Sequence, residues 1–400
     1  MPNFQGVWSL SEQYQAIGSQ NWPMAPGAPT SVSASAGDEQ ATVSFTAPSF
    51  TGVPPGVTQY RVTSDPEAIT ETGSASPITV TGLTNDTSYT FSVQATNGVQ
   101  FGPAGVSGSV TPAFIPTAWF AGGGSNVIDF VAIATTGNAT DWGDLQSSVS
   151  NTAGCSSATR GLVQRNSTNV DYITFATQGN SVSFGNLSSA RDSDGALANG
   201  TRGVFAGGEG AASFSDVMDY FTIATTGNAT DFGDLFVGRR DPSGYASSTR
   251  GCFNMGQISP GGVWTNTIDY ITIATTGNAL DFGDATQSLG NSAGCSSSTR
   301  GIIMGGNNPF SSNVIQYVTI ASTGNALDFG DLTVVASGCA GASSETRGLR
   351  AGGENVGTTS NSNVIDYITI ASTGNATDFG DLTTSRTEVV GLSNAHGGLS

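Results

Sequence analysis

The chain has 400 residues and a formal net charge of −18, from 30 acidic residues and 12 arginines, with no lysine. This charge argues against nucleic acid or an anionic membrane surface as the main partner. No run of about 18 apolar residues is present, so we expect no membrane insertion. The length predicts two or three domains. Because 55 residues are glycine and 37 % are apolar, the composition favours a turn-rich β-protein over a disordered chain.

The four cysteines and the single histidine provide no metal-binding motif. Cys155, Cys252, Cys295 and Cys339 contain no CxxC pair, and His396 is the only histidine. This pattern argues against a Cys/His zinc site and predicts buried, reduced thiols. The first residues, MPNFQGVWSL, lack the basic start and long apolar stretch of a signal peptide. We therefore expect synthesis in a cytoplasm.

Residues 1–25 are expected to form an N-terminal arm. Ser9 followed by Glu12 is a capping-box signature, and it predicts a short helix that ends at Gly18. The segment is too short to bury its own aromatic residues. These are Trp8, Tyr14 and Trp22. One interpretation is a helix folded back on the next domain; the other, which we adopt, is an arm whose aromatic residues anchor it on a partner.

Residues 26–112 show the strand pattern of a second unit. The predicted strands are Ala41–Phe45, Tyr60–Thr63, Ile78–Val80 and Tyr89–Ala95. The stretch GLTNDTSYTFSVQATN resembles the signature of a fibronectin type III domain, in which a leucine, here Leu83, precedes the tyrosine of a tyrosine corner, here Tyr89, by six residues. Phe45 departs from the family, which usually has a tryptophan there. The resemblance implies a β-sandwich that serves as a spacer or adhesive module.

From residue 117 to residue 400 the chain is an array of repeats. The unit is clearest in NTIDYITIATTGNALDFGD, residues 266–284, and its TGN or QGN turn recurs at intervals of 42 to 50 residues. The turn glycines are Gly137, Gly179, Gly227, Gly277, Gly324 and Gly374. A second landmark, Thr-Arg-Gly, contains Arg160, Arg202, Arg250, Arg300 and Arg347, with His396 in the sixth slot. A period of about 48 residues predicts one four-stranded propeller blade per repeat.

The fifth repeat shows the four strands of one blade. They are Ala293–Ser298, Gly301–Met304, Val314–Ala321 and Leu327–Leu332. The first consists of small residues, as expected where innermost strands converge on a narrow channel. The first repeat begins at its second strand, Trp119–Ala121, and Glu388–His396 aligns with the missing first strand. Six blades result if these two segments pair and close the ring without an exposed sheet edge.

Three features of the repeats resemble the kelch type of propeller. They are an arginine before the first strand (Arg191, Arg386), a double glycine after the second (Gly207-Gly208, Gly352-Gly353) and aromatic residues in the third and fourth (Tyr220, Phe232). The second repeat departs from this pattern, with Gln164 and Arg165 in place of the double glycine. The expected fold is therefore all-β: a helical arm, a fibronectin type III sandwich and a six-bladed kelch-like β-propeller over residues 117–400.

Repeated aspartates are the strongest candidates for a metal site. Those in the third strands are Asp129, Asp171, Asp219, Asp269 and Asp366, and five D(F/W)GD motifs carry two more each. Calcium is one interpretation, because carboxylate and carbonyl oxygens are its preferred ligands. Local hydrogen bonds in turns and strands are the other. Because the same set recurs in nearly every repeat, we expect the structural role, and we predict no metal or cofactor.

The repeated arginines invite comparison with the carboxylate-binding arginines of sialidases. Their even spacing instead favours bonds to a carboxylate or carbonyl of the adjacent blade. The sialidase Asp-box pattern SxDxGxTW is absent, and so are GxSxG, P-loop and HExxH motifs. We therefore expect a protein without catalytic residues.

One face of the predicted propeller has variable loops. On it lie the connections between second and third strands, and those from each fourth strand to the next first strand. The candidate binding residues there are Phe214, Phe236, Arg239, Arg240, Tyr245, Trp264 and Phe310. Aromatic residues in such loops suit stacking on sugar rings or a protein partner, and arginines suit an acidic group. The alternative is that they merely cover the blades.

The arm WSLSEQYQA, the single fibronectin-like domain and the NxIDYxTIATTGNATDFGDL repeats together resemble virion structural proteins of tailed bacteriophages, particularly marine cyanophages. The resemblance implies a non-enzymatic virion protein, either a tail or fibre component or a head decoration protein. A third hypothesis is that the chain is a glycan hydrolase. The expected partners are other virion proteins, through the arm, and a host surface glycan or protein; homo-oligomerisation stays open.

Overall fold

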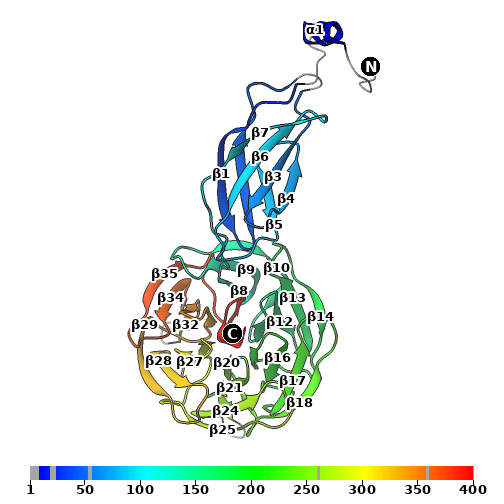
Figure 1. Cartoon of the computed structure of the whole chain (residues 1–400). Helices are drawn as coiled ribbons and strands as arrows, with labels where there is room; N and C mark the ends of the chain where they lie inside the picture. The colour runs from blue at the N-terminus through cyan, green and yellow to red at the C-terminus, as the bar shows by residue number, and fades with distance from the viewer. Residues whose placement is uncertain are drawn as a thin grey trace. The chain divides into compact units, whose positions relative to one another are not determined.

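The computed structural model describes residues 9–18, 24–52, 56–211, 213–258, 262–356 and 360–399. In this part of the chain the helical elements are α1, Leu10–Gly18, and one 3₁₀ turn, η1, Gly397–Leu399; all other elements are strands. The chain divides into two compact units, Met1–Ile115 and Pro116–Ser400. Figure 1 traces the strands of both units. The all-β class expected from the sequence is confirmed.

Helix α1 begins with the expected capping box. The Ser9 amide donates to Glu12 Oε2 at 2.8 Å, and the Glu12 amide donates to Ser9 Oγ at 3.4 Å. These bonds satisfy two amides that a helix start otherwise leaves unpaired. The bonds that the Glu12 carboxylate accepts from Ser9 lower its pKa. The predicted helix and its end at Gly18 are confirmed.

The described part of the first unit is a two-sheet sandwich. Its strands are β1 Thr30–Gly37, β2 Gln40–Thr46, β3 Gln59–Asp65, β4 Thr70–Gly73, β5 Ile78–Thr81, β6 Thr90–Thr96 and β7 Phe101–Val106. All pairs are antiparallel, and the sheet orders are β1-β2-β5 and β4-β3-β6-β7. Burial alternates along β2 and β3, which places every second side chain in the core between the sheets.

Tyr89 secures the loop before β6. Its ring is fully buried, and its hydroxyl accepts the Thr84 amide at 2.9 Å and donates to Glu67 Oε2 at 2.5 Å. This is the expected tyrosine corner, because the hydroxyl bonds to backbone a few residues upstream. Phe45, which departs from the family pattern, is buried against Tyr60 with ring centroids 4.7 Å apart. The smaller ring therefore still fills its core position.

The described part of the second unit contains six four-stranded antiparallel sheets. Given from first to fourth strand, sheet 1 is β36 Val389–Ser393, β8 Thr117–Gly122, β9 Ser125–Ala132 and β10 Thr140–Val149; sheet 2 is β11 Gly154–Ser156, β12 Arg160–Asn166, β13 Asn169–Thr174 and β14 Val182–Asn186; sheet 3 is β15 Gly195–Ala198, β16 Arg202–Ala206, β17 Val217–Thr222 and β18 Thr230–Asp234.

The remaining sheets follow the same order. Sheet 4 is β20 Ser243–Ala246, β21 Arg250–Asn254, β24 Thr267–Thr272 and β25 Leu280–Asp284; sheet 5 is β26 Ala293–Ser296, β27 Arg300–Met304, β28 Ser312–Thr319 and β29 Leu327–Ala336; sheet 6 is β30 Ala340–Ser343, β31 Arg347–Ala351, β34 Val364–Thr369 and β35 Thr377–Asp381. Short ribbons on the loops are β19 Arg239–Arg240, β22 Gln257–Ile258 and β23 Val263–Trp264, and β32 Glu354–Asn355 with β33 Ser360–Asn361.

The sheets follow one another around a common centre (Figure 1). Their first strands contact one another in the order β11, β15, β20, β26, β30 and β36, and β36 contacts β11 again. Strand β36 pairs antiparallel with β8, so that Val390 lies opposite Ala121 and Leu392 opposite Trp119. This is the pairing expected between Glu388–His396 and Trp119–Ala121. Sheet 1 is therefore built from both ends of the second unit.

Close approach explains why the first strands consist of small residues. A Cβ on Gly294 would lie 2.4 Å from the Gly244 carbonyl oxygen, and one on Gly341 would lie 2.2 Å from the Gly294 oxygen. Neighbouring first strands are therefore too close for a side chain at this position. Ser343 and Ser393 add bonds between sheets, because each hydroxyl donates to a carbonyl of the neighbouring first strand, at 2.7 and 2.6 Å.

The TGN turn of each sheet bonds to the fourth strand of the preceding sheet. The turn asparagine accepts a backbone amide at 3.0 to 3.2 Å in every case. The pairs are Asn138 with Asp381, Asn180 with Asp144, Asn228 with Asn186, Asn278 with Asp234, Asn325 with Asp284 and Asn375 with Asp331. The first of these joins sheet 1 to sheet 6. The glycine of the DFGD motif is needed here, because a Cβ on Gly380, at a φ of +148°, would lie 2.4 Å from the Gly137 oxygen.

Candidate binding face

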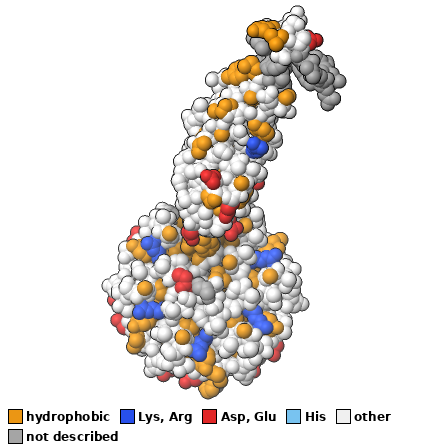
Figure 2. Space-filling view, in the orientation of Figure 1, with side chains coloured by type: hydrophobic (Ala, Val, Ile, Leu, Met, Phe, Trp, Pro, Cys, Tyr) orange, Lys and Arg blue, Asp and Glu red, His pale blue; other side chains and the backbone are white. Residues whose placement is uncertain are grey.

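The repeated arginines bridge neighbouring sheets. Arg202 Nη1 donates to the Ile273 carbonyl at 3.0 Å, and its guanidinium lies 4.6 Å from the centroid of the Tyr220 ring. The equivalent bonds are Arg160 to Ile223 and Ala224, Arg250 to Ile320, Arg300 to Ile370 and Arg347 to Ile133. Bonding to the adjacent sheet, the preferred sequence interpretation, is confirmed. Figure 2 shows basic side chains spread over the visible face of the second unit.

The third-strand aspartates are buried opposite arginines of their own sheets. Asp219 meets Arg191 at 2.9 Å, and Asp129 meets Arg386 at 2.6 Å. The other pairs are Asp171 with Arg165, Asp269 with Arg239 and Asp366 with Arg350. Burial raises the pKa of Asp171 and of Asp269, whereas the facing arginine lowers it. These carboxylates therefore serve structural ion pairs.

The aspartates of the D(F/W)GD motifs lie at the outer strands. Asp231 and Asp281 are exposed, and the amide of Asp234 bonds to the TGN turn of the next sheet. Within the described residues, no group of three or more His, Cys, Asp or Glu side chains is placed to hold a metal ion. The four cysteines are buried and free of disulfides, as expected.

Two of the seven candidate binding residues are largely exposed. Phe236, between β18 and β19, is 73 % exposed, and Phe310, between β27 and β28, is 69 % exposed. Trp264 on β23 is half-buried, because its ring packs where a Cβ on Gly290 would stand. The loops that carry these residues all lie at one end of the sheets, since they join second to third and fourth to first strands.

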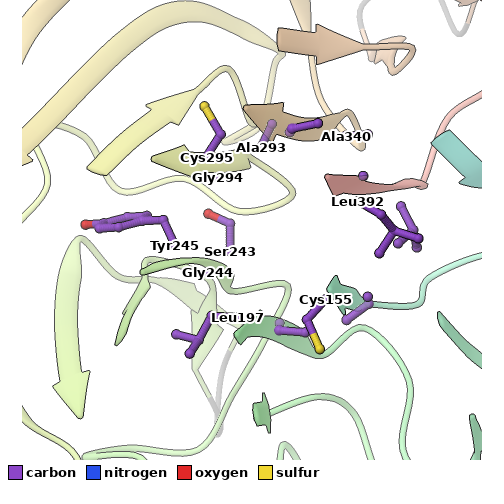
Figure 3. A pocket seen from close by; sticks show the side chains of 18 of the residues that line it. Cys155, Leu197, Ser243, Gly244, Tyr245, Ala293, Gly294, Cys295, Ala340 and Leu392 are labelled. Atoms are coloured by element: carbon purple, nitrogen blue, oxygen red, sulfur yellow. The ribbon is translucent and has the colours of Figure 1, made fainter. Parts of the chain in front are cut away.

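Tyr245 does not belong to the binding face, and this expectation was wrong. The first strand of its sheet begins at Ser243, so Tyr245 lies within β20 and is 3 % exposed. Figure 3 shows its side chain pointing away from the space between the first strands. The ring occupies the space beside Gly301 of the next sheet, where a Cβ would lie 2.1 Å from a ring carbon. Burial raises the pKa of Tyr245 well above its usual value.

Arg239 was also wrongly assigned to the binding face. It is fully buried, pairs with Asp269, and donates to the carbonyls of Met255 and Thr267 at 3.3 and 3.2 Å. Burial lowers the pKa of this guanidinium, against the effect of Asp269. Arg239 is therefore the sheet 4 counterpart of Arg191. Its position before the first strand, combined with Asp269 in its sheet, was a sequence signal of this role.

Arg240, Phe214 and Glu209 come together at the surface. Arg240 Nη1 donates to Glu209 Oε2 at 2.6 Å, and its Nε donates to Gln257 Oε1 at 2.9 Å. Its guanidinium lies 5.2 Å from the centroid of the Phe214 ring, which is half-buried. Both predicted residues are thus on the face, but the arginine already has an acidic partner within the chain.

Sequence reasoning missed a pocket on the same face. It has a volume of about 580 Å³. Its polar lining includes Asn151, Asp192, Ser193, Glu209, Arg240 and Asp241. Burial, with repulsion from Glu388 and Glu209, raises the pKa of Asp241 to about 6. Burial and Glu209 also raise the pKa of Asp192. These residues occupy positions that differ from repeat to repeat, so no repeated pattern could reveal them.

The pocket adjoins a ring of residues that precede the first strands. The ring residues, all with φ between +53° and +60°, are Asn151, Ser193, Asp241, Asn291, Gly338 and Glu388. From Ser193 onward, each ring amide donates to the carbonyl of the preceding member, at 2.5 to 3.3 Å. Beyond the ring, a cavity of about 170 Å³ lies between the first strands (Figure 3). The ends of the loops that lead into successive first strands are therefore hydrogen-bonded to one another.

Comparison with known proteins identifies one part of the chain. A sequence model of the fibronectin type III domain matches residues 27–110. These residues form a fibronectin type III domain. Its strands β1 to β7 and its tyrosine corner at Tyr89 agree with the resemblance noted in the sequence. No curated protein matches the chain.

A solved structure titled "Structure of YjhT" is similar in fold. The TM-score is 0.52 at 9 % sequence identity, and the likeness covers 61 % of this chain and 87 % of that chain. At this identity the similarity concerns the fold alone. Among the described residues, neither α1 nor any other helix has the length and apolar character that crossing a membrane requires.

Proposed function

We propose that the second unit is a six-bladed, kelch-like β-propeller, with each four-stranded sheet as one blade. The pairing of β36 with β8, the contacts between successive first strands and the six equivalent bonds of the TGN turns support this proposal. The buried pairs of Arg191 with Asp219 and Arg386 with Asp129 agree with the kelch-like arginine position. The fibronectin type III domain then acts as a spacer.

We further propose that the chain is a non-enzymatic virion structural protein of a tailed bacteriophage, a tail or fibre component whose propeller binds a host surface glycan or protein. The observation that carries this proposal is the exposure of Phe236 and Phe310 on variable loops of the face that also holds the polar pocket. Exposed aromatic residues at a polar rim suit stacking on sugars or anchoring in a protein. The repeated Thr-Arg-Gly arginines and the third-strand aspartates, by contrast, are engaged in contacts within and between sheets.

The N-terminal arm is proposed to anchor the protein in the particle. Leu10 and Tyr14, 73 % and 72 % exposed, are four residues apart on α1 and so share one side of the helix. Trp8 and Trp22, the other expected anchors, lie outside the described residues. An exposed apolar pair on a short helix fits a groove on another virion protein. A head decoration protein would use the same kind of anchor, so the arm does not separate the two locations.

Adsorption of particles to host cells tests the binding face. Particles carrying the double substitution Phe236→Ala and Phe310→Ala are expected to adsorb several-fold more weakly, because both rings are exposed and support no core. Leu327→Ala is the matched control, since Leu327 is 58 % exposed on the fourth strand of sheet 5, away from these loops. Unchanged adsorption of the double variant, with normal incorporation into particles, would place host binding elsewhere.

A further inference from the structure

Residues 394–399 close one end of the cavity between the first strands. The turn η1 packs against the ends of β15 and β26: a Cβ on Gly398 would lie 2.1 Å from the Ala198 oxygen, and one on Gly397 would lie 2.1 Å from Ser297. Both glycines are buried. His396 itself contributes to the lining of the cavity. The backbone of this turn is therefore wedged between sheets 3 and 5.

The segment has two attachments of different kinds. The Thr117 amide donates to Asn394 Oδ1 at 2.7 Å, and the Asn394 amide donates to the Thr117 carbonyl at 3.3 Å. These bonds hold the end of β36 whatever the pH, since neither group titrates. Beyond Asn394, the Ala395 amide donates to Ser393 Oγ at 3.0 Å, and Gly397 and Gly398 pack against sheets 5 and 3. The His396 imidazole is the titratable group that links the turn to β11. Loss of its bond would weaken the hold on the turn but leave β36 paired with β8.

Both nitrogens of His396 are engaged. Nε2 lies 2.8 Å from the Ser156 carbonyl, and Nδ1 lies 3.1 Å from the Gly398 amide. A carbonyl can only accept and an amide can only donate, so Nε2 carries the proton and Nδ1 accepts. The ring is therefore neutral in the closed turn. A second proton on Nδ1 would point at the Gly398 N–H and remove the acceptor.

The ionisable groups around the ring offer little compensation for a positive charge. The neighbouring first strands carry Cys155 on β11, Tyr245 on β20 and Cys295 on β26. The Tyr245 side chain points away from the cavity (Figure 3), and burial raises the pKa of all three groups, so they are neutral near pH 7. Glu345 is the carboxylate that faces His396, and it already accepts the Ser298 amide at 3.0 Å and hydroxyl at 2.8 Å. Burial outweighs both the hydrogen bond to the Ser156 carbonyl and the charge of Glu345, and so lowers the pKa of His396 below 6.5.

We propose that His396 is a pH-sensitive latch: the neutral imidazole holds residues 396–399 over the end of the cavity, and protonation of Nδ1 releases them. The released histidine has its ordinary pKa of 6.5, whereas burial in the closed turn lowers the pKa. The free energy needed to open the turn therefore decreases as the pH falls below 6.5. This inference is independent of host binding and of the virion location.

Nuclear magnetic resonance of the whole chain measures the latch directly, with nitrogen-15 in histidine for the imidazole and in all residues for the Gly398 and Leu399 amides. The chain has one histidine, so its signals need no assignment. We expect the Nε2–H tautomer near neutral pH. Hydrogen exchange of the Gly398 and Leu399 amides, corrected for intrinsic rates, should become faster between about pH 7.5 and about pH 5, by at most about thirtyfold.

The variant His396→Gln supplies the control. Glutamine offers an N–H donor for Ser156 but does not titrate, so exchange at Gly398 and Leu399 should not change with pH after the same correction, whether the turn is closed or open. An imidazole that titrates at or above 6.5 in the folded chain would overturn the latch, because protonation would then not oppose closure. Equal exchange of the wild type at both pH values would overturn it as well.

Discussion

Charge compensation inside the sheets is visible at the level of single residues. Five sheets pair a buried third-strand aspartate with an arginine, whereas sheet 5 has Gln316 at this position. Gln316 Oε1 accepts the Thr286 amide at 2.6 Å and carries no charge. A buried aspartate without a cation would destabilise the folded state, because nothing would compensate for the removal of its charge from water. The neutral glutamine is therefore consistent with a sheet in which no such arginine is paired.

Breaking one of these pairs should be costly. Asp269→Ala leaves Arg239 buried without its partner, so we expect the free energy of unfolding to fall by about 3–5 kcal/mol. Urea denaturation measures the change. The control is Asp281→Ala on the exposed side of β25, for which we expect a change within about 0.5 kcal/mol. Similar losses for both variants would refute the structural role of the Asp269 pair.

Asp194 gives the stability a defined pH dependence. Burial raises its pKa to about 7 from 3.8, and its nearest arginine, Arg191, lies at 3.9 Å and is committed to Asp219. The raised pKa means that the protonated group favours the folded state. This contribution is fully present below pH 3.8 and is lost as the pH rises through about 7.

Asp194→Asn removes the cost of the charge. We therefore expect the variant to be more stable than the wild type at about pH 8, by an amount on the order of 1–3 kcal/mol, and the difference to shrink toward about pH 4. Urea denaturation of both proteins across this pH range measures the difference. A difference that stays constant across the range would show that Asp194 has the same pKa in the folded and unfolded chain.

At the level of strands, the repeat pattern predicted much of the second unit. Predicted Ala293–Ser298 and Leu327–Leu332 correspond to β26, Ala293–Ser296, and β29, Leu327–Ala336. The repeats specified these strands because each sheet reuses the same inter-sheet contacts. The roles of residues near the loops were harder to predict. Tyr245 occupies the position in β20 that Cys155 and Leu197 occupy in β11 and β15, and the large ring at this position led to the wrong prediction of a loop residue. The polar pocket could not be predicted, because its lining residues do not recur from repeat to repeat.

Substitution of an inner glycine tests the spacing of the first strands. Gly341→Ala places a Cβ about 2.2 Å from the Gly294 oxygen, a backbone atom that cannot turn aside. We expect a loss of about 1–3 kcal/mol in unfolding free energy. Gly227→Ala is the matched control in a TGN turn, where a Cβ would meet nothing within 4 Å. Thermal melting of both variants checks the contrast, and equal melting temperatures would contradict the close packing.

At the scale of the whole molecule, β36 joins the two ends of the second unit. Deletion of residues 386–400 removes the partner of β8 and also Arg386, which pairs with Asp129. The freed edge of β8 is then available to other chains, so we expect aggregation. Light scattering and the melting temperature of the truncated protein measure the effect. A soluble, monodisperse product with unchanged melting would show that the β36–β8 pair does not stabilise the unit.

The proposed role depends most on where the protein sits in a virus particle. A reconstruction of the whole particle by electron microscopy locates it, because the two-sheet sandwich and the ring of six sheets differ clearly in shape. We expect both densities on the tail or its fibres, with the loops that carry Phe236 and Phe310 accessible from outside. Density confined to the head, or the absence of this chain from purified particles, would contradict the account.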